Sequence, residues 1–126
     1  MSFDIYFQGF RGGDPVAGGG DRMRAVIEPF ASRQEPRSNF WLVQIGDGTA
    51  DVYLEDDHMM ASRVSGQDPW GLLVKGAQAA GWVIMPVGCP TCLTQEGQLR
   101  ELPEELQEPV AVVNSGPDLV AVVEAS

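Results

Sequence analysis

The stretch NFWLVQIGDGTADVYLE, residues 39–55, decides the fold. Apolar and polar residues alternate on both sides of Asp47-Gly48, which is typical of two antiparallel strands joined by a two-residue type I′ turn. With Gly46 and Thr49 as the closing pair, every second residue falls on one apolar face, and the others form a mixed face. The expected pairs on the apolar face are Ile45 with Ala50, Val43 with Val52, and Trp41 with Leu54. The expected mixed face holds Phe40, Leu42, Gln44, Asp51, Tyr53 and Glu55.

Further strands are expected on either side of this hairpin. The turn Glu55-Asp56-Asp57 leads to a third strand over residues 58–65, which makes a β-meander. The polar residues 32–38 are interpreted as a connector. Residues 3–8 alternate with a period of two, which predicts an N-terminal strand with one buried face. Its apolar positions are Phe3, Ile5 and Phe7.

Two segments have clear helix signals. Asp21 is the expected N-cap of a first helix, which Pro29 ends near Glu28, because the residue before proline avoids the helical region. Asp68-Pro69 opens a second helix with an acidic N-cap and proline in the first turn, and Gly81 stops it. The expected buried side of this second helix holds Trp70, Leu73, Val74 and Ala77.

The last third of the chain adds apolar strands and an acidic connector. Residues 82–87 are apolar on both faces, which indicates an interior strand ending at Pro86. Residues 88–92 are expected to form a loop. The acidic residues 96–108 are expected to hold one short helical turn, and residues 110–113 a final strand.

The end of the chain has two interpretations. Ser115 and Asp118 have the spacing of a capping box, which favours a short helix over residues 115–124. The valine-rich composition is poor for a helix, so a closing strand is the alternative. In both cases the sequence predicts a single α+β domain over residues 1–126: an antiparallel sheet with a central β-meander and two or three helices packed on one face.

Composition and charge limit the class of partner. The chain of 126 residues has no apolar run long enough to span a membrane and no secretory signal, so we expect a soluble, cytoplasmic protein without a membrane partner. Its 8 basic and 18 acidic residues give a net charge of −10. This field repels nucleic acid and favours a basic protein partner, while acidity that only keeps the protein soluble is the alternative.

The mixed face of the hairpin is the expected partner-binding surface. Aromatic anchors surrounded by charge are typical of protein interfaces. The predicted surface consists of Phe40, Leu42, Asp47, Asp51, Tyr53, Glu55, Asp56 and Asp57. The acids Asp47, Asp51, Glu55, Asp56 and Asp57 could also gather around a divalent cation. Their spacing is not that of a calcium-binding loop, so a solvated hairpin face is favoured over a cation site.

The pair Cys89 and Cys92 has the C-x-x-C spacing of a zinc or redox site. Zinc needs two further ligands, of which His58 supplies at most one, so a carboxylate or a second chain would have to complete the site. Two reduced thiols in a tight turn are the favoured interpretation, with no bound cofactor. His58 has no evident nucleophile beside it, so no catalytic residue is predicted and the chain is expected not to be an enzyme.

The features above resemble a group of small uncharacterised bacterial α+β proteins that begin MSFDxxxQ. They are the opening MSFDIYFQGFRGGD, the helix at residues 21–28, the hairpin at residues 41–54, and Asp68-Pro69-Trp70 leading into residues 83–86. The resemblance brings no catalytic motif. In size and charge such proteins are similar to the immunity proteins of bacterial toxin systems, which occlude a toxin's active site.

The sequence therefore predicts a non-enzymatic, acidic protein-binding module, an immunity-like inhibitor of a basic protein. A zinc-binding or thiol-redox protein using Cys89 and Cys92 is the first alternative. A structural subunit of a homo-oligomer is the second.

Overall fold

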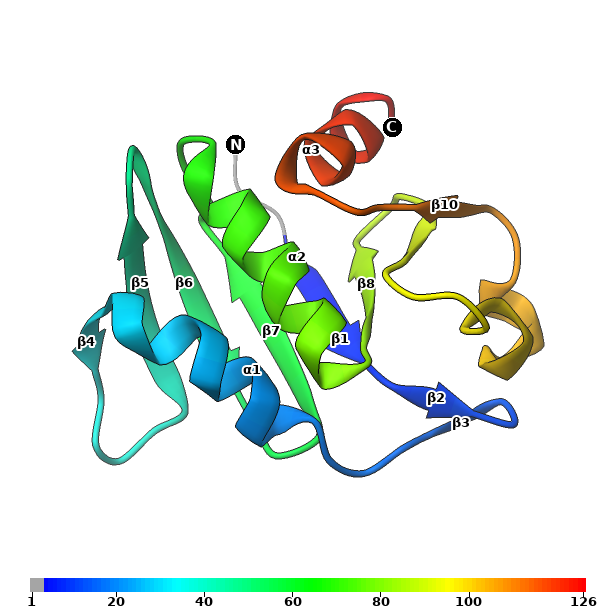
Figure 1. The fold of residues 1–126 in the computed structure, drawn as a ribbon, viewed down its shortest axis with the longest axis horizontal. Coiled ribbons are helices and arrows are strands. Elements are labelled where there is room, and N and C mark those ends of the chain that lie inside the picture. The colour runs from blue at the N-terminus through cyan, green and yellow to red at the C-terminus, as the bar shows by residue number, and fades with distance from the viewer. Residues whose placement is uncertain (1–3) are drawn as a thin grey trace.

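A computed structural model describes residues 4–126 of the chain (Figure 1). The main sheet contains β1 (Ile5–Gln8), β4 (Ala31–Gln34), β5 (Phe40–Ile45), β6 (Gly48–Leu54), β7 (His58–Ser62), β8 (Val83–Pro86), β9 (Thr91–Leu93) and β10 (Val110–Val112). A separate small hairpin consists of β2 (Phe10–Arg11) and β3 (Asp14–Pro15). The helices are α1 (Gly20–Ile27), α2 (Asp68–Ala80) and α3 (Gly116–Glu124), and the 3-10 turns are η1 (Glu28–Phe30), η2 (Leu99–Glu101) and η3 (Glu104–Leu106).

The eight strands of the main sheet are ordered β10-β9-β8-β1-β7-β6-β5-β4. Strands β9 and β10 run parallel, and the other neighbours run antiparallel. The predicted meander is β5-β6-β7. The α+β single-domain fold expected from the sequence is confirmed.

The N-terminal strand β1 joins the two halves of the sheet. It pairs with β7 on one side and with β8 on the other. Ile5 and Phe7 are fully buried, as their alternation predicts, whereas Phe3 lies outside the described residues. Strands β7 and β8 do not pair with each other, because β1 lies between them. The backbone hydrogen bonds of β1 therefore hold the two halves of the sheet together.

The β5–β6 hairpin has the predicted faces but a different register. Trp41 pairs with Val52 and not with Leu54, and the central turn residues are Gly46 and Asp47 in place of Asp47 and Gly48. Gly46 has a φ of 54° and Asp47 a negative φ, which is the pattern of a type II′ turn. Since the pairing shifts by two residues, no side chain changes face.

The polar connector expected over residues 32–38 is wrong in part. Ala31–Gln34 forms the edge strand β4, which pairs with β5 through an irregularity between Ala31 and Arg33. Three of the four β4 residues are exposed, so the strand has no alternation of apolar and polar residues to reveal it. The acidic residues 96–108 were expected to hold one short helical turn, but they contain two 3-10 turns, η2 and η3.

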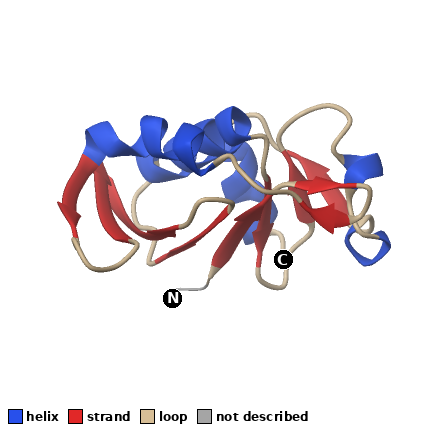
Figure 2. Ribbon diagram, turned by 90° about the horizontal axis from the view of Figure 1, so that it is seen from below, coloured by secondary structure: helices blue, strands red, loops and turns tan. Residues whose placement is uncertain are grey.

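The helices cover one face of the sheet, with α2 in contact with both α1 and α3 (Figure 2). The predicted stripe of α2 is buried, and Gly81 ends the helix with a φ of 75°. The expected N-caps are wrong, since Gly19 and Gln67 occupy those positions. The chain ends in a helix and not in a strand: the Ser115 hydroxyl accepts a hydrogen bond of 3.3 Å from the Asp118 N–H.

The opposite face is covered in one half only. Residues 94–109 fold over β8 and β9, where Val83, Leu93 and Leu102 bury a second small cluster. Below β5, β6 and β7 the structure between residues 4 and 126 places no helix (Figure 2). None of the helices in this range is long and apolar enough to cross a membrane.

Candidate functional site: the open-face groove

A row of aromatic and methionine side chains crosses the uncovered half of the sheet. Tyr6 lies opposite Met60, Met60 opposite Tyr53, and Tyr53 opposite Phe40, on four successive strands. Directly opposed residues point to the same face, so these four side chains share the open face. The Phe40 and Tyr53 ring centroids are 5.3 Å apart at an interplanar angle of 55°, and Tyr6 is 44% exposed. We call these four residues the aromatic row.

A groove of about 1050 Å³ lies over Phe40, Tyr53 and Met60. Residues 35–38 line one side of it, and Ser62 and Arg63 at the end of β7 line another. The charged residues that line it are Arg33, Arg37, Arg63, Asp4, Glu35 and Asp51. Three positive and three negative groups make the groove neutral, although the chain as a whole carries −10.

Two of the three arginines have a carboxylate partner. Arg33 Nη2 lies 2.6 Å from Glu35 Oε1, and Arg63 Nε lies 4.0 Å from Asp51 Oδ2. Arg37 forms no ion pair with any residue from 4 to 126. The groove therefore has one guanidinium free to bind a carboxylate from outside.

Arg63 has a backbone conformation that arginine rarely adopts. Its φ is 52°, in the left-handed region that costs energy for a residue with a Cβ. Strain of this kind persists where the surrounding structure imposes it, and it concentrates at functional sites. Here it occurs at the rim of the groove, where the Arg63 side chain is 77% exposed.

The structure brings some predicted surface residues together and separates others. Phe40, Asp51 and Tyr53 line the groove, and Leu42 pairs with Asp51 beside it. Glu55, Asp56 and Asp57 follow β6 at one end, whereas Asp47 lies in the turn at its other end. The seven residues of β6 separate these ends by roughly 20 Å, so the predicted acids do not form one patch.

The Asp47 carboxylate is hydrogen-bonded to backbone groups within the protein. Its Oδ1 accepts hydrogen bonds of 2.9 Å from the backbone N–H groups of Gln67 and Asp68, at the start of α2. In return, Asp68 Oδ2 accepts from the Asp47 N–H at 3.2 Å. The bonds from Asp68 and Gln67 lower the pKa of Asp47. In this structure the Asp47 carboxylate links the hairpin turn to α2, and its part in partner binding stays a prediction.

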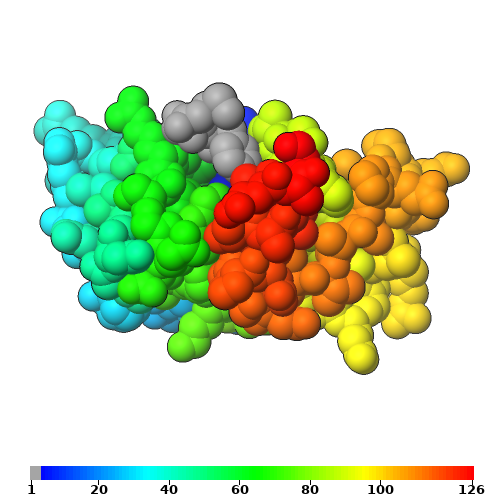
Figure 3. All heavy atoms as spheres, turned by 90° about the horizontal axis from the view of Figure 1, so that it is seen from above, coloured from blue at the N-terminus to red at the C-terminus, as the bar shows by residue number. Residues whose placement is uncertain are grey.

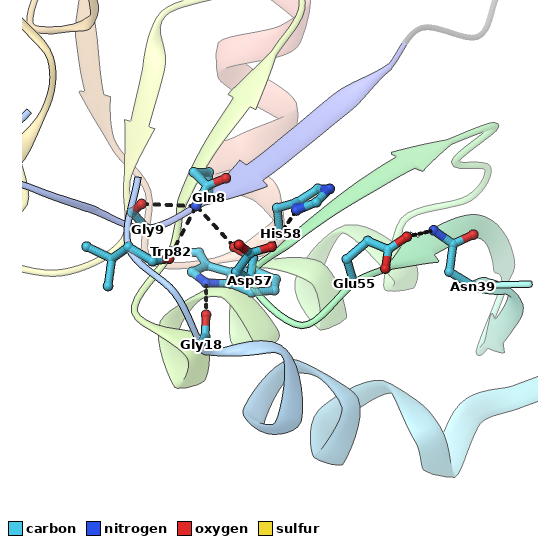
Figure 4. A network of polar contacts seen from close by, with 9 residues as sticks. Gln8, Gly9, Gly18, Asn39, Glu55, Asp57, His58 and Trp82 are labelled. Carbon is cyan, nitrogen blue, oxygen red and sulfur yellow. Dashed lines mark hydrogen bonds and ion pairs between the residues drawn. The ribbon is translucent and has the colours of Figure 1, made fainter. Parts of the chain in front are cut away.

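Two of the three acids at the other end of β6, Glu55 and Asp57, are also hydrogen-bonded within the protein (Figure 4). Asn39 Nδ2 donates to Glu55 Oε1, and Asp57 Oδ1 lies 2.7 Å from His58 Nδ1. The backbone carbonyl of Asp57 accepts a hydrogen bond of 3.1 Å from Gln8 Nε2. These contacts attach the β6–β7 turn to β1 and to the start of β5.

The arginines of the groove were not predicted as site residues. Arg33 and Arg37 fall in the supposed connector, and Arg63 follows the end of a strand. One signal was available: these three are the only basic residues between positions 25 and 74. Their common location in the groove comes from the structure, which places all three in its lining.

The two cysteines differ in their surroundings: Cys92 is buried, whereas Cys89 is partly exposed. Cys92 lies in β9 and not in a loop, and it is fully buried against the helices, opposite Ile84. Burial, with a smaller contribution from Cys89, raises the pKa of Cys92 to about 12, which disfavours the thiolate and its nucleophilic reactivity. His58 alternates with the buried Met59 and hence points to the opposite face. Within residues 4–126 no group of three or more potential metal ligands occurs.

No family model, curated protein or solved structure matches this chain. The likeness to immunity proteins stays a prediction.

Proposed function

We propose that this protein is a non-enzymatic binding module, an immunity-like inhibitor that docks a basic protein on its open-face groove. The observation that carries the proposal is the aromatic row. Tyrosine, phenylalanine and methionine are enriched in interface cores. Tyr6 is 44% exposed, and Phe40, Tyr53 and Met60 are partly exposed, so the row is accessible to a partner.

Charge defines the partner more closely. The net charge of −10 attracts a basic protein over a distance and speeds its association. The groove itself is neutral, so the surface that enters it need not be basic. It should carry an apolar anchor for Phe40 and Tyr53 and a carboxylate for Arg37.

The groups that line the groove suit the binding of a partner better than they suit catalysis. Its charged groups are arginines and carboxylates, two pairs of which already neutralise each other. His58, the only histidine in the sequence, is bonded to Asp57 and does not line the groove.

Affinity purification with three baits tests this proposal. The baits are the wild type, the double variant Phe40→Ser/Tyr53→Ser, and the control Phe30→Ser, which removes an aromatic side chain that is 37% exposed outside the groove. We expect the wild type and the control to retain a basic protein that the double variant loses. After identification and purification, that protein should bind the wild type with a salt-dependent association rate.

Two results would contradict the proposal. One is a set of captured proteins that does not differ among the three baits. The other is capture of this chain itself, which would favour the structural subunit of a homo-oligomer.

A further inference from the structure

The two edges of the main sheet are protected to different degrees. The edge strand β4 carries Arg33 and an irregular pairing, both of which discourage addition of another strand. At the other edge, β10 has the sequence Val-Ala-Val, without charge or proline, and pairs regularly with β9. Its main contact is with β9. The β10 edge is short, with three residues, but it lacks the charged side chains, prolines and bulges that protect other sheet edges from pairing.

The outward backbone groups of β10 can be identified from its bonds to β9. The Pro109 carbonyl accepts a hydrogen bond of 3.1 Å from the Thr91 N–H, and the Val113 N–H donates one of 2.9 Å to Leu93. Alternate residues of a strand face the same neighbour, so the N–H and C=O groups of Val110 and Val112 point away from β9. These groups make no hydrogen bond within the described chain, and Val112 is 65% exposed.

The chain just before β10 is strongly acidic. Glu104, Glu105 and Glu108 are exposed, and none forms an ion pair with another residue in the range 4–126. The segment forms one end of the molecule, coloured yellow to orange in Figure 3. An incoming strand thus meets the exposed side chain of Val112, the partly buried side chain of Val110, and carboxylates at one end.

We propose that the β10 edge binds an extended segment of a partner protein by strand addition. The segment has apolar residues beside Val110 and Val112, and lysine or arginine at the end that meets the carboxylates. A second copy of this chain fits less well, because it would bring its own acidic segment and a charge of −10. The edge lies at the opposite end of the sheet from β4 and β5, so this site is independent of the groove.

A displayed library of seven-residue peptides, selected on the full-length protein, tests this inference. We expect enrichment of peptides that alternate apolar residues and carry lysine or arginine at one end. Binding of the enriched peptides should slow amide hydrogen exchange at Val110 and Val112, which are unprotected in the free protein.

The substitution Val112→Pro removes one outward N–H and leaves the groups that face β9 intact. It should weaken binding of the selected peptides about tenfold, the cost of roughly one hydrogen bond and a steric obstruction. The matched control Val112→Thr keeps the N–H and the branched side chain and should bind as the wild type does. Protected amides at Ala111 and Val113 show that the proline variant is folded. If it is not, peptides N-methylated at alternate residues test the same bonds on the wild-type protein.

Further variants test separately the role of the acidic side chains and the independence of this site from the groove. Replacing Glu104, Glu105 and Glu108 with glutamine should abolish the preference for a basic end, whereas Phe40→Ser/Tyr53→Ser should leave peptide binding unchanged. No enrichment, equal affinity for Val112→Pro, or a basic preference that survives the glutamine variant would overturn the inference. A dimer of the wild type that Val112→Pro dissociates would also overturn it, because a second copy would then occupy the edge.

Discussion

The two halves of the open face differ in whether the chain covers them. Over β8 and β9 the chain folds back, and Leu102 is buried to 2% exposure against Val83 and Leu93. Over β5, β6 and β7 the aromatic row is left uncovered. The halves are continuous, since Met85 pairs with Tyr6 and packs against the covered cluster. The chain thus covers part of an apolar surface and leaves the rest open, which is what a binding face requires.

The largest expected effect concerns β1, the strand that joins the halves. Phe7→Ala removes a fully buried ring from the main core and should lower the free energy of unfolding by about 3–5 kcal/mol. Urea unfolding followed by tryptophan fluorescence measures the change. The control is Tyr6→Ala, one residue earlier on the open face, and its effect should be far smaller. Equal losses would mean that the open face is part of the core.

Truncation in the covered half should have the next largest effect. Leu102→Ala leaves a cavity in the small cluster with Val83 and Leu93, and should cost about 2–3 kcal/mol of unfolding free energy. The same urea measurement applies, with the exposed Leu99→Ala as control. A negligible loss would show that the covering segment contributes little to the stability of the sheet.

Local sequence patterns were sufficient for much of the fold. Residues 41–54 reveal both faces of the hairpin, because alternation depends on neighbours within one strand. The same holds for α2, which begins at Asp68-Pro69 and ends before Gly81. These elements contain their own signals, so no distant contact was needed to find them.

The parts that were missed depend on distant contacts. Asp47 is held by N–H groups 20 and 21 positions later, and this contact favours a turn one residue earlier than the Asp47-Gly48 pattern suggests. Gly48 lies so close to the Ser65 carbonyl that a Cβ there would collide with it. The groove likewise combines arginines from the segment around β4 and from the end of β7. Such arrangements follow from the assembled sheet and are not visible in a single segment.

A smaller effect is expected from the open half. Tyr53→Ser removes a half-buried ring and its contact with Phe40, and should cost about 1 kcal/mol of unfolding free energy. The same variant should weaken docking of a partner much more than it weakens the fold. The comparison with Leu102→Ala is direct, because both measurements use urea unfolding. A loss as large as that of Leu102→Ala would show that the row stabilises the domain and is not kept for binding.

The smallest expected effect is a dependence on pH at Asp47. The hydrogen bonds from Asp68 and Gln67 lower its pKa in the folded protein, while in the unfolded chain it has its ordinary value, near 3.8. A lowered folded pKa contributes stability above the unfolded value, and that stability is lost as the pH falls through the folded pKa. Asp47→Ala should therefore lower the urea midpoint at pH 7, and its difference from the wild type should shrink as the pH falls below about 4.

Asp56→Ala is the matched control, because no side-chain hydrogen bond of Asp56 occurs within residues 4–126. Its difference from the wild type should stay constant over the same pH range. If the Asp47→Ala difference also stays constant in acid, the carboxylate charge does not stabilise the start of α2. The link between the hairpin turn and the helix would then depend on the remaining contacts, such as the bond between the Ser65 N–H and the Thr49 carbonyl.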